Sequence, residues 1–136
     1  MRVLVDTHVL LWLSDDSERL SDPARTVLAQ AAAAGGLAVS AISYWEVAML
    51  ASRGRISLAM PVPAFRDRAR QQAGIVEVPV DGDIAIESVA LPEWRHADPA
   101  DRIIVATARI HGCVLVTRDA AILAYGETGA VTTVVA

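Results

Sequence analysis

The chain has 136 residues, of which 54% are hydrophobic, and its mean hydropathy is +0.40. These values exclude a disordered protein and predict one domain with a full core, because two ordinary domains need a longer chain. The formal net charge is −4, and all twelve basic residues are arginine, which does not by itself indicate a nucleic-acid-binding protein.

The sequence also limits the compartment and the chemistry of the single thiol. No stretch reaches the roughly 18 apolar residues that a membrane helix needs. Asp6 interrupts the apolar N-terminal stretch, and no small-residue cleavage site follows it. We therefore expect a cytoplasmic protein.

Cys113 is the only cysteine, so an internal disulfide and a thiolate zinc site are excluded. Its apolar context CVLV predicts a core residue.

Short apolar segments alternate with helical patterns along the chain. Strands are predicted at residues 2–6, 37–40, 75–80, 113–117 and 130–135. Helices are predicted at residues 7–13, 21–36, 43–54, 62–74, 81–91, 98–112 and 118–126. Wholly apolar strands between helices indicate parallel pairing, with helices on both faces of the sheet. The predicted fold is a single three-layer α/β/α domain that covers residues 1–136.

Four acidic residues stand at the ends of predicted strands or at the starts of predicted helices. Asp6 ends the first strand, and Asp119 directly follows the fourth. Glu46 lies in the first turn of the helix after the second strand, and Asp101 in the first turn of the helix before the fourth. Because sites in open α/β sheets form outside the carboxyl ends of the strands, we expect these four residues at one rim.

Each acidic residue also has a purely local explanation. In HADPADRIIVATA, Asp98 is a favoured N-cap, and Pro99 suits the first helical position. The other local roles are a turn for Asp6, a capping box of Ser43 with Glu46, a position near the positive end of the helix dipole for Asp101, and an N-cap for Asp119. For any one residue taken alone, both explanations stay open.

Taken together, four carboxylates at one rim favour a bound cation. Like charges at close range raise one another's pKa and destabilise the fold unless a cation joins them. Mg²⁺ and Mn²⁺ prefer oxygen ligands and need neither His nor Cys. Carboxylate-held divalent ions can activate water and stabilise charge on a phosphate oxygen. The pattern therefore favours metal-assisted phosphodiester hydrolysis.

With these residues placed, the chain resembles the PIN-domain ribonucleases of the VapC toxin type over nearly its whole length. The similar segments, in chain order, are VDTHVLLWL, VSAISYWEVAML, HADPADRIIVATA and LVTRDAAILAYG. The resemblance implies that the metal-binding and catalytic residues are Asp6, Glu46, Asp101 and Asp119. Asp98 is a second candidate, whose role the resemblance does not separate from helix capping.

The resemblance has further implications. It implies a PIN domain over residues 1–136 with a five-stranded parallel sheet, a homodimer, and Mg²⁺- or Mn²⁺-dependent cleavage of RNA. It also implies inhibition by a cognate VapB-type antitoxin, whose tail lies in an apolar groove and often presents an arginine to the acidic pocket.

One segment is strongly basic. Residues 53–70 contain five arginines against Asp67 alone, a local charge of +4. This segment could meet phosphate groups, or it could be the solvated face of an amphipathic helix.

Three other functions compete with this one. A non-catalytic PIN-fold binding module would leave four costly carboxylates without a purpose. An aspartyl-phosphate fold uses a lysine at its phosphate site, and this chain has none. A nuclease that acts on DNA or on structured flaps stays open, because no stacking platform for bases is evident and the aromatic residues Tyr44, Trp45 and Trp94 are expected in the core or an interface.

Overall fold

The computed structural model describes residues 2–15 and 17–136, and in this part of the chain five strands form one parallel sheet. The strands are β1 (Val3–Val5), β2 (Leu37–Ser40), β3 (Val76–Val78), β4 (Val114–Thr117) and β5 (Thr133–Val135). They lie in the order β3-β2-β1-β4-β5, and every neighbouring pair is parallel. The predicted five-stranded parallel sheet is confirmed.

The helices lie where the sequence predicts them, within a few residues at each end. They are α1 (Thr7–Asp15), α2 (Asp22–Ala33), α3 (Ala41–Ser52), α4 (Val62–Gln71), α5 (Gly82–Ala90), α6 (Pro99–His111) and α7 (Ala120–Glu127). A short 3₁₀ turn at Ser17–Arg19 was not predicted. No helix in residues 2–15 or 17–136 is long and apolar enough to cross a membrane.

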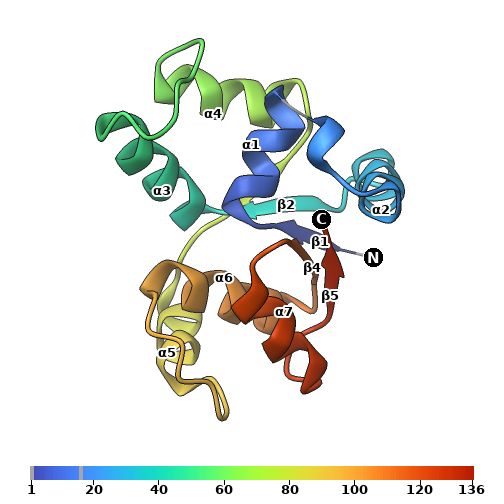
Figure 1. The fold of residues 1–136 in the computed structure, drawn as a ribbon, viewed down its shortest axis with the longest axis vertical. Coiled ribbons are helices and arrows are strands. Elements are labelled where there is room, and N and C mark those ends of the chain that lie inside the picture. Colours follow the sequence, from blue (N-terminus) through green and yellow to red (C-terminus); the bar gives the residue numbers. More distant parts are fainter. Residues whose placement is uncertain (1, 16) are drawn as a thin grey trace.

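The sheet separates two apolar cores, as expected for a three-layer domain (Figure 1). Side chains alternate along the central strand, so that Val3 and Val5 face one core and Leu4 faces the other. The first core contains residues of α1, α2, α3 and α4, and the second contains residues of α5, α6 and α7. All three strand residues are almost fully buried, which explains the continuous apolar sequence of β1.

The start of α3 differs from the prediction. The helix begins at Ala41, because the hydroxyl of Ser40 at the end of β2 caps it by accepting a hydrogen bond from the Ile42 N–H (3.2 Å). The capping box of Ser43 with Glu46, the local alternative for Glu46, is therefore not formed. The prediction that Glu46 lies in the first turn is wrong, since it lies in the second turn of α3. Ser43 is fully buried and contacts α1 instead.

The ends of α6 agree with the prediction. The Asp98 side chain caps the helix by accepting a hydrogen bond from the Asp101 N–H (3.1 Å), and Pro99 is the first helical residue. The helix ends at Gly112, whose φ of +63° is a left-handed conformation that glycine adopts without strain. The sequence of this helix thus determines both of its ends and holds Asp101 in its first turn.

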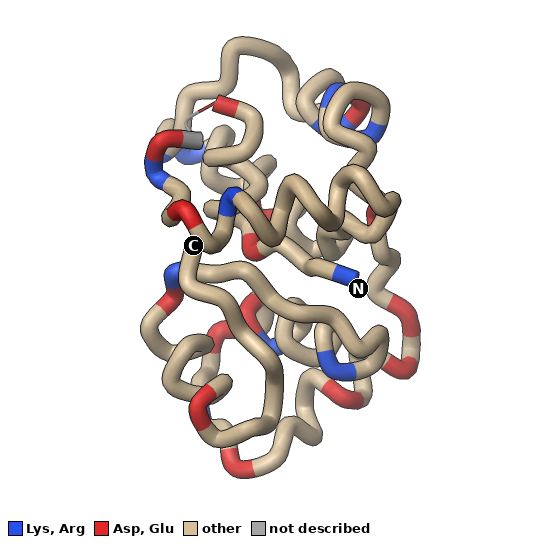
Figure 2. Tube along the Cα trace, turned by 90° about the vertical axis from the view of Figure 1, so that its right-hand side faces the viewer, with Lys and Arg blue, Asp and Glu red and all other residues tan. Residues whose placement is uncertain are grey.

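The charges are spread over the molecule rather than gathered in one patch of a single sign (Figure 2). In the basic segment, Arg66 makes a two-point ion pair with Glu77 on β3, with N–O distances of 2.6 and 2.8 Å. Two other arginines of that segment, Arg55 and Arg68, line a groove beside α1. The predicted local charge of +4 is therefore partly neutralised by the sheet.

Candidate functional site

The candidate site lies at the carboxyl ends of the three central strands. From β1 the chain continues to β2 and β3 on one side of the sheet, and later to β4 and β5 on the other. The order therefore reverses between β1 and β4, which is where open α/β sheets form their binding crevices. Asp6 directly follows β1, and Asp119 lies two residues beyond Thr117, the last residue of β4.

Asp6 is buried and is held by two hydrogen bonds. Its Oδ1 accepts a hydrogen bond from the Thr7 N–H (2.7 Å), and its Oδ2 accepts one from the Thr117 hydroxyl (2.6 Å). The side chain is only 7% exposed. Since Thr117 comes from the neighbouring strand, the carboxylate is fixed relative to both β1 and β4.

Glu46 reaches the site from α3 and is held by the start of α1. The Thr7 hydroxyl donates a hydrogen bond to its Oε1 (2.5 Å) and also lies 2.9 Å from the Ser43 hydroxyl. A hydroxyl carries a single proton, so Ser43 donates to Thr7 while Thr7 donates to the carboxylate. This chain of contacts joins residues that are 39 positions apart in sequence.

Asp101 projects from the first turn of α6. Its Oδ2 lies 2.8 Å from His96 Nε2, and its own N–H donates to the side chain of Asp98. Asp101 is only partly exposed, whereas Asp98 is exposed. The capping role predicted for Asp98 is confirmed, and this role directs the Asp98 carboxylate to the helix start.

Asp119 caps α7 while remaining at the site. Its Oδ1 accepts a hydrogen bond from the Ile122 N–H (3.0 Å), and its N–H donates to the Thr117 hydroxyl (3.0 Å). The local and functional explanations therefore do not exclude each other at Asp119. A cap fixes the side chain and leaves its second oxygen available for another contact.

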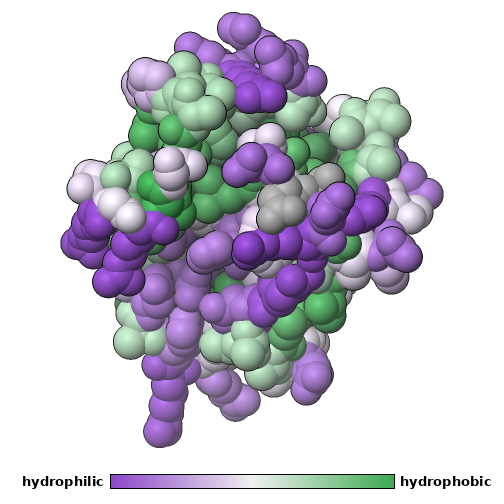
Figure 3. All heavy atoms as spheres, turned by 45° about the horizontal axis from the view of Figure 1, so that its top comes forward, coloured by the Kyte–Doolittle hydropathy of each residue, from purple (hydrophilic) through white to green (hydrophobic). Residues whose placement is uncertain are grey.

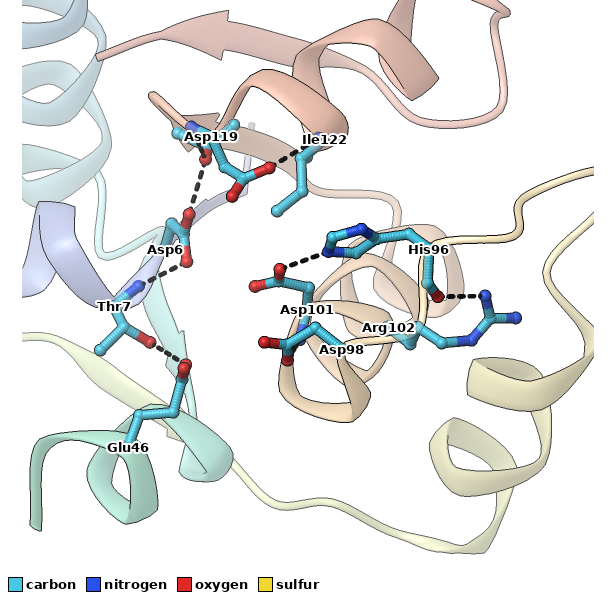
Figure 4. A network of polar contacts seen from close by, with 10 residues as sticks. Asp6, Thr7, Glu46, His96, Asp98, Asp101, Arg102, Asp119 and Ile122 are labelled. Atoms are coloured by element: carbon cyan, nitrogen blue, oxygen red, sulfur yellow. Dashed lines mark hydrogen bonds and ion pairs between the residues drawn. The ribbon is translucent and has the colours of Figure 1, made fainter. Parts of the chain in front are cut away.

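The acidic side chains face one common space (Figure 4). They come from the ends of β1 and β4, from α3 and from α6. Each interacts electrostatically with several of the others: the charges of Asp6 and Asp101 act on Glu46, and the charge of Asp119 acts on Asp6 and Asp101. The structure therefore brings together the four residues that the sequence singled out.

Burial and mutual repulsion favour the protonated forms of these carboxyl groups. Burial, above all, and with it the charges of the neighbouring carboxylates, raises the pKa of Glu46 to about 7 and that of Asp101 to about 6. Burial likewise raises the pKa of Asp6. The hydrogen bonds from Thr7 to Glu46 and from His96 to Asp101 act in the opposite direction, but they do not offset the burial.

The donor chemistry of this cluster fits a hard divalent cation. Among the described residues, the hydrogen bonds recorded for these carboxylates come from backbone N–H groups, threonine hydroxyls and His96, and none comes from an arginine. In the same part of the chain, no three Asp, Glu, His or Cys side chains stand close enough to form a ready-made cage. Each of the four carboxylates accepts at least one hydrogen bond from a protein donor, which restrains its direction at the site.

The sequence interpretation missed the residues that orient the acids. Thr7, Thr117 and His96 each donate a hydrogen bond to one of the acidic side chains. Two of these residues carry a signal in the sequence, since Thr7 adjoins Asp6 and Thr117 ends the predicted fourth strand. Their acceptors, however, lie on other elements and follow only from the three-dimensional structure.

A groove of about 620 Å³ lies next to the site, between α1, the segment after α3, and α4. Its apolar lining includes Leu11, Trp12, Ile56, Leu58, Met60 and Phe65. Figure 3 shows this apolar surface recessed between hydrophilic side chains. The lining also includes His8, which lies on the first turn of α1 two residues after Asp6. The groove is thus lined in part by α1, the helix that begins directly after Asp6.

The fold and the acidic cluster define a class of protein, and comparison with known families identifies it. The model of the PIN domain matches residues 3–127, and the chain belongs to this family. The chain is 42% identical over 117 residues to Ribonuclease VapC22 of Mycobacterium tuberculosis (strain ATCC 25618 / H37Rv), a match that covers 86% of each protein. The resemblance noted in the sequence is therefore confirmed.

Solved structures agree with this assignment. A toxin–antitoxin complex from Klebsiella pneumoniae contains a chain that is 28% identical, with a TM-score of 0.54 and coverage of 86% of both chains. VapBC2 from Rickettsia felis, bound to a DNA fragment from its promoter, matches with a TM-score of 0.72 at 12% identity over 99% of this chain and 98% of that one. The second similarity, at so low an identity, concerns the fold alone.

Proposed function

We propose that this protein is a metal-dependent endoribonuclease and the toxin of a VapBC-type toxin–antitoxin pair, built as one PIN domain over residues 1–136. The observation that carries the proposal is the convergence of Asp6, Glu46, Asp101 and Asp119 at the carboxyl end of a parallel sheet. The 42% identity to a protein named as a ribonuclease supports RNA as the substrate.

In this proposal, Asp6, Glu46, Asp101 and Asp119 hold Mg²⁺ or Mn²⁺. When bound, the ion supplies charge stabilisation at the scissile phosphate and a more acidic water. The protein supplies ionised oxygens in fixed directions. Thr117 and Thr7 restrain Asp6 and Glu46, and the first turns of helices restrain Asp101 and Asp119. Rigid placement of this kind lets the site act without a large rearrangement of the backbone.

Asp98 has a secondary role in this proposal. Its side chain is committed to the cap of α6, and its charge acts on both Glu46 and Asp101. Asp98 therefore contributes to the negative field of the site and places Asp101. We do not assign it as one of the principal ligands.

The partner in this proposal is a cognate VapB-type antitoxin. The groove beside α1 has an apolar lining for one face of a peptide segment, and its lining residue His8 lies two residues after Asp6. A peptide that follows this groove can reach the cluster and neutralise it with an arginine, the side chain best suited to paired carboxylates. Binding there would cover the approach to the site.

Brief induction of the protein in a bacterial host, followed by sequencing of new RNA 5′ ends, tests the proposal. The wild-type protein is expected to create discrete new ends within minutes. The Asp6→Asn variant, expressed to the same level, is expected to create none, and Asp98→Asn is expected to retain most of them. Absence of new ends from the wild-type protein would favour a non-catalytic binding module, and identical ends from Asp6→Asn would rule out the acidic cluster as the active site.

A further inference from the structure

The segment between α5 and α6 delivers one side chain to the acidic cluster. Residues 91–98 form neither helix nor strand, and Glu93 within them has a left-handed φ of +54°. From this segment His96 points at Asp101, with its Nε2 2.8 Å from Oδ2 (Figure 4). Loop segments are normally more mobile than helices and strands, so a precise contact from this segment needs additional support. Two sets of contacts hold His96 in place.

Arg102 fixes the backbone of this segment. Its guanidinium group donates to four backbone carbonyls, those of Ser88 (2.7 Å), Val89 (3.3 Å), Trp94 (2.9 Å) and His96 (2.9 Å). These carbonyls belong to the last turn of α5 and to the segment that follows it. Arg102 directly follows Asp101, so the first turn of α6 carries both the acidic side chain and the group that fixes the backbone of His96.

A column of stacked rings fixes the imidazole ring of His96. Trp94 stacks on Tyr125 of α7, with ring centroids 4.6 Å apart and planes inclined by 11°. His96 stacks on Trp94 at 4.9 Å and 27°. The Tyr125 hydroxyl donates to the Pro92 carbonyl (2.6 Å), and the Arg102 guanidinium group lies over the Trp94 ring at 5.7 Å. The imidazole ring is therefore restrained in its plane and in its position.

This arrangement has a direct consequence for Asp101. The His96 contact occupies Oδ2, and the other carboxylate oxygen points toward Asp6 in Figure 4. A carboxylate at the start of a helix can otherwise rotate toward solvent, because its outer torsion is broad. The contact removes that freedom and selects the rotation in which one oxygen faces the other acids.

We propose that His96 is a positioning residue that orients Asp101 for the divalent ion, and that Arg102 and the stacked column of Trp94 and Tyr125 hold His96 for this purpose. This inference rests on the proposed function, in which Asp101 is a ligand. Hydrogen-bond partners of ligating carboxylates commonly tune metal affinity in this way. His96 itself neither contacts the ion nor supplies a ligand.

The test is calorimetric titration of the purified protein with Mn²⁺, together with RNA cleavage on the same samples. His96→Phe keeps an aromatic ring for the stack on Trp94 and removes the donor. We expect this variant to bind Mn²⁺ about 10- to 100-fold more weakly than wild type. His96→Gln places an amide N–H near the position of Nε2 and is expected to restore affinity to within about threefold of wild type. Arg95→Gln, an exposed change in the same segment, is the matched control and is expected to match wild type.

Each outcome separates this inference from the proposed function. If wild type fails to bind Mn²⁺ and to cleave RNA, the proposed function fails. If wild type binds and Asp101→Asn does not, but His96→Phe binds like wild type, only the role of His96 is overturned. Tighter binding by His96→Phe would also overturn it, because His96 would then compete with the ion for Asp101. If His96→Phe does not fold, Arg102→Lys provides a second test, because lysine keeps the positive charge but lacks the several N–H donors of the guanidinium group. Arg102→Lys is expected to lose as much Mn²⁺ affinity as His96→Phe. Wild-type Mn²⁺ affinity in Arg102→Lys would contradict the inference.

Discussion

Asp101 combines two roles that are easily confused from sequence. It occupies the third position of α6, where a negative charge is favourable, and its carboxylate faces three other acids. Asparagine keeps the size and the hydrogen-bonding oxygen of the side chain but removes the charge that a hard cation requires. Substitution at this position therefore separates stability from activity.

Asp101→Asn is expected to reduce RNA cleavage by more than about 100-fold, since even indirect partners of metal ligands contribute up to that much. The metal-free variant is expected to unfold at the same temperature as wild type or higher, because a buried like charge has been removed. Glu46→Gln is expected to behave in the same way. Cleavage rates in Mn²⁺ and melting temperatures in EDTA, measured on the same preparations, test this. A loss of stability without a loss of cleavage would contradict it.

The raised pKa values predict how pH affects the metal-free protein. The pKa of Glu46 is about 7 in the folded chain against an ordinary 4.5, so the folded state keeps this proton at a pH where the unfolded state has lost it. Stability is therefore expected to fall as the pH rises through this range, and Asp101, with its pKa of about 6, acts in the same direction. Urea unfolding in EDTA at pH 5 and pH 8 measures the effect. Glu46→Gln should reduce it, and a stability that increases with pH would contradict the account.

At the scale of single elements, helix starts determine where the acidic side chains point. Asp98 begins α6 and Asp119 begins α7 through the same kind of contact, a carboxylate that accepts a backbone N–H three residues further on. Both caps follow directly from the local sequence. The start of α3 did not follow, because Ser40 and Ser43 are both acceptable caps and only the end of β2 decides between them.

The cap of α6 predicts a difference between two substitutions at one position. Asp98→Ala is expected to lower the free energy of unfolding by about 1 kcal/mol, whereas Asp98→Asn should change it by only a few tenths. Cleavage by Asp98→Asn should stay within about tenfold of wild type, since its effect on the ion is indirect. Urea unfolding in EDTA gives the first quantity and initial cleavage rates give the second. Equal destabilisation by both substitutions would show that the charge, and not the cap, matters at this position.

Connections between elements were the part that the sequence could not supply. The alternation of apolar strands and helices predicted the parallel sheet, and the places of the four acids at strand ends and helix starts predicted one rim. Two hydrogen bonds join elements that are distant in sequence, one from Thr7 to Glu46 and one from Thr117 to Asp6. The delivery of His96 depends on an irregular segment whose path no periodicity encodes. Local patterns specify elements, and packing specifies which of their side chains meet.

At the scale of the whole molecule, exposed apolar side chains on α5 favour association between two copies of this chain. Ile86 is 72% exposed and Val89 is 81% exposed, and their spacing of three places them on one face of the helix. Exposed apolar groups gathered in this way commonly mark an interface. This face is our candidate for the homodimer that the family resemblance implies.

A single charge on this face should prevent the association. Wild type is expected to scatter light as a species of twice 14.4 kDa, and Val89→Glu as a 14.4 kDa monomer. Ala29→Glu, which adds the same charge at an exposed position of α2, is the control and should remain dimeric. Dimers of Val89→Glu with wild-type stability toward dilution would place the interface elsewhere.

If the four carboxylates form one metal site that cleaves RNA, cleavage must depend on both the ion and Asp6. The most direct measurement is the initial rate of cleavage of a single-stranded RNA by the purified protein, as a function of Mn²⁺ concentration, for wild type and Asp6→Asn. A saturable, EDTA-reversible rate is expected for wild type, and a loss of more than about 100-fold is expected for Asp6→Asn. Cleavage that is independent of Mn²⁺, or a full rate in Asp6→Asn, would contradict it.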